Sequence, residues 1–183
     1  MTINELYNER CSKSSDINEH LPILFKYAKK CDHITEFGVR TGNSTIAFLA
    51  ANPKKLISYD INIDKEIQLL TDLSIKENIN FYYIIHSSHT AEIEYTDLLF
   101  IDTDHGEFGT SKELENTKGK ISKYIILHDS VTFGRYDAGD GNPINRGILF
   151  AIDKFLNENK NWKIIEDLKN NNGLLVLGNI DNI

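Results

Sequence analysis

Short apolar runs alternate along the chain with longer stretches in which apolar residues recur every three or four positions. The runs have the length of strands, and they lie at residues 33–39, 56–61, 80–86, 97–102 and 124–129. The stretches between them have the spacing of helices that bury one face, and they cover residues 43–51, 64–77, 109–120 and 142–158. This alternation predicts an α/β fold in which a parallel sheet has helices on both faces.

The two ends of the chain depart from this alternation. A helical stripe precedes the first strand and consists of Ile17, Leu21, Leu24, Ala28 and Cys31. Pro22 fits the first turn of that helix, where a missing N–H is tolerated. Near the other end, residues 162–168 and 174–178 are apolar runs joined by a segment that ends in Asn-Gly. Because Asn-Gly between two such runs favours a tight turn, we expect a terminal antiparallel hairpin.

The length of the chain fits one domain. It has 183 residues, with no internal repeat, no low-complexity tract and no linker rich in Pro, Gly or Ser. We therefore expect a single domain over residues 1–183, with a helical segment over about 1–32 and a cofactor-binding core over 33–179.

The charge and the cysteines narrow the function classes. Twenty basic and 27 acidic residues give a net charge of −7, which disfavours a nucleic-acid partner or an anionic membrane surface. Cys11 and Cys31 lack the spacing of a metal finger or a redox pair, so we expect free thiols in a reducing compartment. The first residues contain no apolar signal segment, and this predicts a cytoplasmic protein.

Ligands of such sheets bind outside the carboxyl ends of the strands, so the residues found there are the first candidates. The first strand leads into a turn with Gly38 and Gly42, four positions apart, which is neither the dinucleotide fingerprint nor a Walker loop. Glu36 precedes this turn and would repel a phosphate, so it suits a cationic or amino-bearing ligand. Asp60 ends the second strand, where an acid can accept hydrogen bonds from ribose hydroxyls.

The ends of the next three strands are polar. Ser87 follows the third strand and could bind an adenine edge, although turn formation explains it equally well. The fourth and fifth strands end in acidic clusters that contain histidine, namely Asp102, Asp104 and His105 and then His128 and Asp129. These clusters could ligate a divalent metal, or a carboxylate could orient a histidine as general base. Ordinary helix caps are the remaining alternative.

A polar segment that contains glycine, residues 132–146, follows the fifth strand. A loop at this place is a plausible lid over the substrate, with Arg135, Tyr136 and Arg146 as its candidate contacts. A simple connector is the alternative.

Four features of the chain together resemble class I S-adenosylmethionine-dependent methyltransferases. They are the segment from Glu36 to Ser44, Asp60, the run F-I-D-T-D-H and the run I-L-H-D-S. The last two runs are similar to the group described as cephalosporin hydroxylase-like or macrocin O-methyltransferase-like. The resemblance runs from about Ser15 to Gly178. It implies a Rossmann-like, doubly wound, mostly parallel seven-stranded sheet that a C-terminal antiparallel hairpin closes.

The resemblance also implies roles for individual residues. Glu36, Gly38 and Gly42 would hold the methionine end of the cofactor with Ser44 beside them, and Asp60 would bind the ribose. Asp102 would contact the cofactor and ligate magnesium or another divalent metal, with Asp129 and His128 as further ligands. His105 stands where some relatives have a lysine that deprotonates the acceptor. Without a metal it would take the proton itself, held by Asp104 or a neighbouring carboxylate.

The implied activity is O-methylation of a small-molecule or sugar hydroxyl, with S-adenosyl-L-methionine as cofactor. An oxidoreductase of the NAD type and a non-catalytic cofactor-binding relative remain alternatives. A nucleic-acid aminomethylating enzyme would need a D/N-P-P-Y motif, and the three prolines of this chain are isolated. Members of the group are often dimers, so a homodimer stays open.

Overall fold

The computed structural model describes residues 1–136 and 146–183. Seven strands form one sheet: β1 (His33–Phe37), β2 (Lys55–Asp60), β3 (Phe81–Ile85), β4 (Thr96–Ile101), β5 (Ile121–His128), β6 (Trp162–Leu168) and β7 (Leu174–Asn179). Their order is β3-β2-β1-β4-β5-β7-β6. Strands β1 to β5 are parallel, whereas β7 runs antiparallel to both β5 and β6. The mostly parallel, doubly wound sheet and its terminal hairpin are therefore confirmed.

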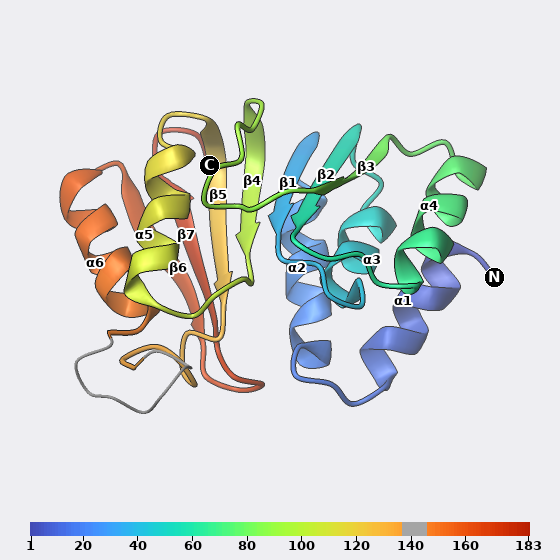
Figure 1. Cartoon of the computed structure of the whole chain (residues 1–183), viewed down its shortest axis with the longest axis horizontal. Helices are drawn as coiled ribbons and strands as arrows, with labels where there is room; N and C mark the ends of the chain where they lie inside the picture. The colour runs from blue at the N-terminus through green and yellow to red at the C-terminus, as the bar shows by residue number, and fades with distance from the viewer. Residues whose placement is uncertain (137–145) are drawn as a thin grey trace.

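Helices cover both faces of the sheet (Figure 1). On one face lie α1 (Ile3–Ser12), α2 (Leu21–Ala28), α3 (Asn43–Ala50) and α4 (Glu66–Lys76), with a short 3-10 turn, η1 (Asn18–His20), before α2. On the other face lie α5 (Glu107–Asn116) and α6 (Ile148–Glu158). Each face buries its own apolar cluster, because residues of a strand point alternately to the two sides. Ile34, for example, belongs to the cluster under α1–α4, and Phe37 to the cluster under α5 and α6.

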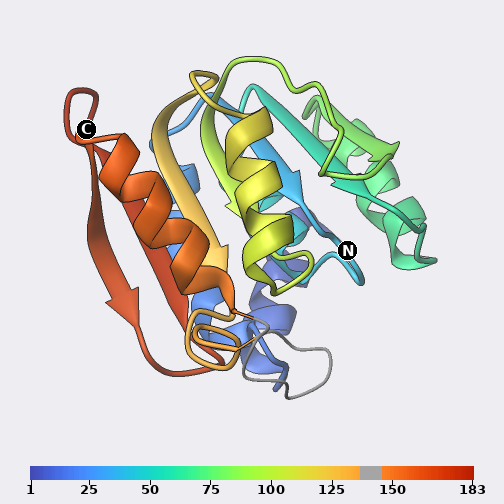
Figure 2. The same ribbon diagram turned by 60° about the vertical axis from the view of Figure 1, so that its left-hand side comes forward.

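The order of the strands reverses between β1 and β4, which lie side by side with Phe37 opposite Ile101. Chain connections leave these two strands in opposite directions, so the loops after them diverge and leave space at the carboxyl edge. The hairpin also reaches this edge, because Leu174 at the start of β7 pairs with His128 at the end of β5. Figure 2 shows the turn between β6 and β7 beside the N-terminal segment at this end of the sheet.

The predicted helix over residues 142–158 needs a correction. The described helix begins at Ile148, and Gly147 before it is extended with φ −80° and ψ −173°. The N–H groups of Gly147 and Ile148 donate to the carbonyl oxygens of Arg135 at 3.0 Å and Phe133 at 3.1 Å, so the chain pairs with another loop here instead of continuing the helix. Residues 142–145 of the prediction lie outside the described residues. None of the described helices is long and apolar enough to cross a membrane.

Candidate functional site

The turn between β1 and α3 depends on two glycines with left-handed backbones. Gly38 has φ +82°, and a Cβ added to it would lie 2.0 Å from the carbonyl oxygen of Asp102. Gly42 has φ +76°, and its Cβ would lie 2.3 Å from a methyl carbon of Leu70. Glycine is therefore required at position 38 for the close approach of β1 to β4, whereas at position 42 the left-handed backbone is what favours it. Arg40, between the two glycines, also has a positive φ, of 49°.

Asp60 at the end of β2 fixes this turn. Its Oδ2 accepts hydrogen bonds from the backbone N–H groups of Val39 at 2.8 Å and Arg40 at 3.0 Å. Its Oδ1 accepts from the N–H of Asn62 at 3.0 Å. Burial alone would raise the pKa of Asp60, but the backbone N–H donors stabilise the charged form and hold its pKa below the ordinary value. The site therefore keeps a carboxylate at this strand end.

A cavity of about 550 Å³ opens at the carboxyl edge of the sheet. It begins at Gly38, passes Asp60 and ends between the loops after β3 and β4, where Ser87, Ser88 and Thr103 line it. The described residues thus bring Gly38, Asp60, Ser87, Asp102 and Asp104, all of them predicted site residues, to one cavity. Its volume lies in the range of small-molecule and cofactor sites.

A second cavity of about 180 Å³ adjoins the first. The two share five lining residues, which are Gly38, Val39, Arg40, Asp102 and Thr103. Ser44, His105 and Asp129 line only the second cavity, together with Asp16 from the N-terminal segment. Among the described lining residues, Arg40 is the only lysine or arginine, whereas aspartates line both cavities. The predicted acidic character of the strand ends is therefore a property of these two cavities.

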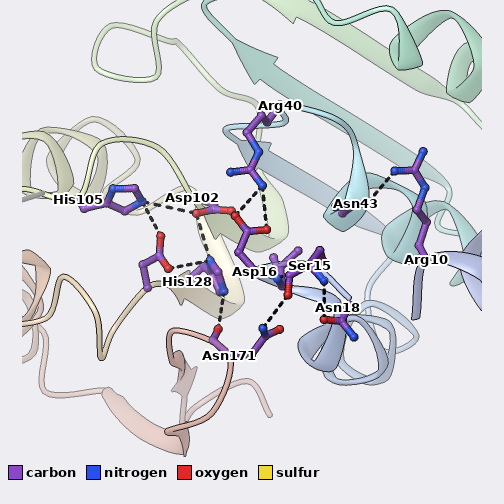
Figure 3. Close-up of polar contacts among 12 residues, drawn as sticks. Arg10, Ser15, Asp16, Asn18, Arg40, Asn43, Asp102, His105, His128 and Asn171 are labelled. Atoms are coloured by element: carbon purple, nitrogen blue, oxygen red, sulfur yellow. Dashed lines mark hydrogen bonds and ion pairs between the residues drawn. The ribbon is translucent and has the colours of Figure 1, made fainter. Parts of the chain in front are cut away.

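The carboxyl ends of β4 and β5 bring together two aspartates and two histidines (Figure 3). His105 Nε2 lies 2.7 Å from Asp129 Oδ2 and 3.8 Å from Asp102 Oδ1. His128 Nδ1 lies 3.4 Å from Asp102 Oδ1 and 3.3 Å from Asp129 Oδ1. The His105 ring also stacks on Phe133 at a centroid distance of 4.4 Å. Four of the predicted site residues therefore form one hydrogen-bonded and ion-paired cluster.

The charges within this cluster reinforce one another. Burial alone would lower the pKa of His105, but its contacts with Asp102 and Asp129 raise it to about 9. The same competition raises the pKa of His128, mainly through its contact with Asp102. Burial would raise the pKa of Asp102, yet the two imidazoles hold it well below the usual range. In this arrangement the two histidines favour the protonated form.

Asp104 lies outside this cluster. It is therefore not the carboxylate that holds His105, although that was the first of the two predicted arrangements. Asp104 Oδ2 lies 3.1 Å from His89 Nε2, and Asp104 Oδ1 accepts from the N–H of Gly106 at 3.1 Å. The carboxylate lies against Gly109, where an added Cβ would be 2.0 Å from Oδ2. It therefore sits over the first turn of α5, where the helix dipole favours an anion. Asp129, the neighbouring carboxylate, is the acid that contacts His105.

Two glutamates are fully buried next to the cavities. Glu36 accepts hydrogen bonds from the hydroxyls of Ser44 at 2.5 Å, Thr45 at 2.8 Å and Ser58 at 2.5 Å. Glu113 on α5 accepts from Ser88 at 2.5 Å and Thr103 at 2.6 Å. Burial raises the pKa of each carboxyl to about 7.

Several predicted site residues lie behind or beside the cavities. Glu36, Gly42 and His128 are not among the described lining residues, and Glu36 instead points under α3. The expectation that Glu36 faces the ligand is thereby corrected, because residues 34 and 36 share the face of β1 that packs under α3.

The three predicted substrate contacts also lie outside the described linings. Arg135 and Tyr136 are exposed, and Arg146 forms an ion pair with Glu107 at 2.5 Å. The remainder of the predicted lid, residues 137–145, lies outside the described residues.

Four residues of this site, Arg40, Asp16, Asn171 and Glu113, were not predicted from the sequence. Arg40 lines both cavities and is held by Asp16 at 2.6 and 2.8 Å (Figure 3). Asn171, in the hairpin turn, accepts at its carbonyl oxygen from His128 Nε2 at 3.2 Å. Glu113 is the fourth. A basic residue between the two glycines was the only available signal for Arg40, whereas the others depend on contacts between distant segments.

Asp102, His128 and Asp129 have the chemistry of a divalent-cation site. One ligand atom from each lies within 4.8 Å of the others. Asp129 Oδ1 is buried without a hydrogen-bond partner among the described residues. Because His128 Nε2 is engaged by the carbonyl of Asn171, Nδ1 is left to face the two carboxylates, as in many metal-ligating histidines. These residues therefore fit a cation that prefers oxygen and nitrogen ligands.

No family model and no curated protein sequence matches the chain. Solved structures do match. The SAH-bound methyltransferase PaMTH1 of Podospora anserina is 18% identical with a TM-score of 0.61, and the match covers 96% of this chain and 86% of that one. A putative caffeoyl-CoA O-methyltransferase from Staphylococcus aureus is 14% identical with a TM-score of 0.64, covering 98% and 92%.

The N-methyltransferase NodS from Bradyrhizobium japonicum, in complex with S-adenosyl-L-homocysteine, is 11% identical with a TM-score of 0.62, and the match covers 98% of this chain and 99% of that one. At these identities the likeness concerns the fold. The chain therefore has the Rossmann-like fold of methyltransferases.

Proposed function

We propose that this protein is an S-adenosylmethionine-dependent methyltransferase that methylates a hydroxyl of a small molecule or sugar. The observation that carries the proposal is the 550 Å³ cavity at the switch point, which runs from the glycine turn past Asp60. Two of the similar structures, PaMTH1 and NodS, hold S-adenosylhomocysteine, the product of methyl transfer. An NAD-type oxidoreductase is less well supported, because the turn lacks the dinucleotide fingerprint.

The cofactor would lie across both cavities. Asp60 would accept hydrogen bonds from the ribose hydroxyls, and the base would extend toward Ser87 and Ser88. The methionine end would enter the second cavity. Since Ser44 donates its proton to Glu36, its oxygen can accept from the ammonium group there. Arg40 would release Asp16 and bind the carboxylate at the methionine end of the cofactor instead.

Methyl transfer from a sulfonium is an in-line displacement, so the protein contributes mainly by positioning the acceptor oxygen. The second cavity supplies polar groups for this purpose at His105 and Asp129. Asp102, His128 and Asp129 would hold a divalent cation, which would bind the acceptor hydroxyl and lower its pKa. His105, 2.7 Å from Asp129, is the alternative group for receiving the proton of the acceptor, and because its pKa is raised to about 9 it would do so only in alkaline solution, where the imidazole is neutral.

The placement of the cofactor is tested by Asp60→Asn, measured by calorimetric titration with S-adenosylhomocysteine. Loss of a hydrogen bond to a charged group should weaken binding by roughly 10- to 100-fold. The matched control is Asp72→Asn on α4, an exposed acid that does not line either cavity. Equal affinities of the two variants and the unmodified protein would contradict the proposed ribose site.

A further inference from the structure

Glu113 lies behind the end of the large cavity that the loops after β3 and β4 form, and its side chain contacts both loops. The side chain belongs to α5 and is fully buried. Its Oε1 accepts a hydrogen bond from Ser88, in the loop after β3, and another from Thr103, in the loop after β4. Both hydroxyl residues line the cavity, whereas Glu113 is not among its described lining residues. One buried carboxylate oxygen thus accepts from the hydroxyls of two residues that line the cavity.

This arrangement fixes the direction of the hydrogen bonds inside the cavity. A hydroxyl group has one proton to donate and two lone pairs. Because Ser88 and Thr103 give their protons to Oε1, their oxygens present only lone pairs to a ligand. The direction holds for either charge state of Glu113, since Oε1 accepts in a carboxylate and also in an acid whose proton is on Oε2.

We propose that Glu113 is a positioning residue that makes this end of the cavity select a base with an N–H donor, such as the exocyclic amino group of adenine. The inference rests on the proposed function, because it assumes a nucleoside cofactor with its base between Ser88 and Thr103. A base with a carbonyl oxygen at the same position would face two oxygens with no proton between them, and it would be rejected.

The test compares S-adenosylhomocysteine with S-inosylhomocysteine, in which a carbonyl oxygen replaces the amino group, by calorimetric titration. The unmodified protein should bind the adenosyl compound at least ~10-fold more tightly. Glu113→Met removes the acceptor at nearly constant volume and frees at least one hydroxyl proton, so the preference should fall to within ~3-fold. Glu113→Gln should retain the preference, because the amide oxygen still accepts.

Controls separate this role from a merely structural one. Glu115→Gln, at an exposed position of the same helix, should leave both affinities unchanged. If Glu113→Met fails to fold, the double variant Ser88→Ala and Thr103→Val removes the hydroxyls themselves and should abolish the preference.

The outcomes also separate this inference from the proposed function. An unmodified protein that binds both compounds equally, or a Glu113→Met variant that keeps the full preference, overturns the inference alone. An unmodified protein that binds neither compound overturns the inference together with the proposed function.

Discussion

Asp129 illustrates how single residues prepare this site. It follows β5 with φ +62°, a conformation that Asp and Asn adopt more readily than other residues with side chains. The N–H of Phe133 bonds back to its carbonyl oxygen at 3.0 Å, which stabilises the turn. The carboxylate is thereby directed at His105 and His128 rather than along the strand. The unusual backbone and the ion cluster are therefore two aspects of the same local structure.

Asp129→Asn tests the cation site at this scale. Asparagine tolerates the left-handed backbone but removes one charge from the donor set. We expect Mn²⁺ to raise the melting temperature of the unmodified protein, and the Mn²⁺ affinity of the variant to be at least ~10-fold weaker. Asp153→Asn, an exposed position on α6, is the matched control. The cation site would be contradicted if Mn²⁺ did not raise the melting temperature of the unmodified protein. It would also be contradicted if the two variants had the same Mn²⁺ affinity.

At the scale of elements, β1 and the glycine turn hold the cavities open. The N–H of Gly38 bonds to the carbonyl of Tyr59, and the N–H of Asp102 bonds to the carbonyl of Phe37, both at 2.9 Å. The turn is thus tied to β2 on one side, while β1 is tied to the end of β4 on the other. Displacement of this turn would disturb both cavities at once, because Gly38 lines each of them.

Gly38→Ala should therefore be more harmful than the same change at another left-handed glycine. Gly119 has φ +75° with nothing within 4 Å of an added Cβ, so Gly119→Ala measures the backbone cost alone, about 1 kcal/mol. Gly38→Ala adds the clash with Asp102 and should cost several kcal/mol, at least ~2 more than the control. Denaturant unfolding of both variants measures the difference, and equal losses would show that the contact is unimportant.

The elements were largely predictable, and the reason is physical. Buried parallel strands are continuous apolar runs, so the predicted strand over residues 56–61 differs from β2 (Lys55–Asp60) by only one residue at each end. The helix over 142–158 was wrong at its start because a tertiary contact at Gly147, rather than local propensity, determines where α6 begins.

The site was predictable only where the chemistry follows directly from a strand end, as at Asp60 and Asp102. The pairing of Arg40 with Asp16 joins segments 24 residues apart, and Glu113 reaches the loop of Ser88 from 25 residues away. No local pattern encodes such contacts. Glu36 is a different case, since the alternation along β1 would have placed it on the same side as Ile34, under α3.

For the whole molecule, the net charge of −7 is distributed unevenly. Aspartates gather around the two cavities, and two glutamates are buried behind them. A sulfonium cofactor fits such an environment. The buried glutamates also couple the stability of the protein to pH.

The pH dependence of stability should reveal Glu36. Its pKa of about 7 in the folded protein lies above the value of 4.5 expected when unfolded. Between these values the folded protein retains a proton that the unfolded chain has released. The favourable contribution of Glu36 is therefore complete below about pH 4.5 and is lost as pH rises through about 7, by up to about 3 kcal/mol.

Comparison with Glu36→Gln isolates this contribution. The free energy of unfolding of the unmodified protein, minus that of the variant, should fall between pH 5 and pH 8. Denaturant unfolding at several pH values measures it. Parallel pH profiles would show that Glu36 does not carry a raised pKa.

The central claim, that the large cavity binds S-adenosylmethionine and its product, is tested most directly by calorimetric titration of the unmodified protein. S-adenosylhomocysteine should bind with one molecule per chain, and NAD⁺ should give no binding at the same concentrations. Binding of NAD⁺ without binding of S-adenosylhomocysteine, or binding of neither, would contradict the account.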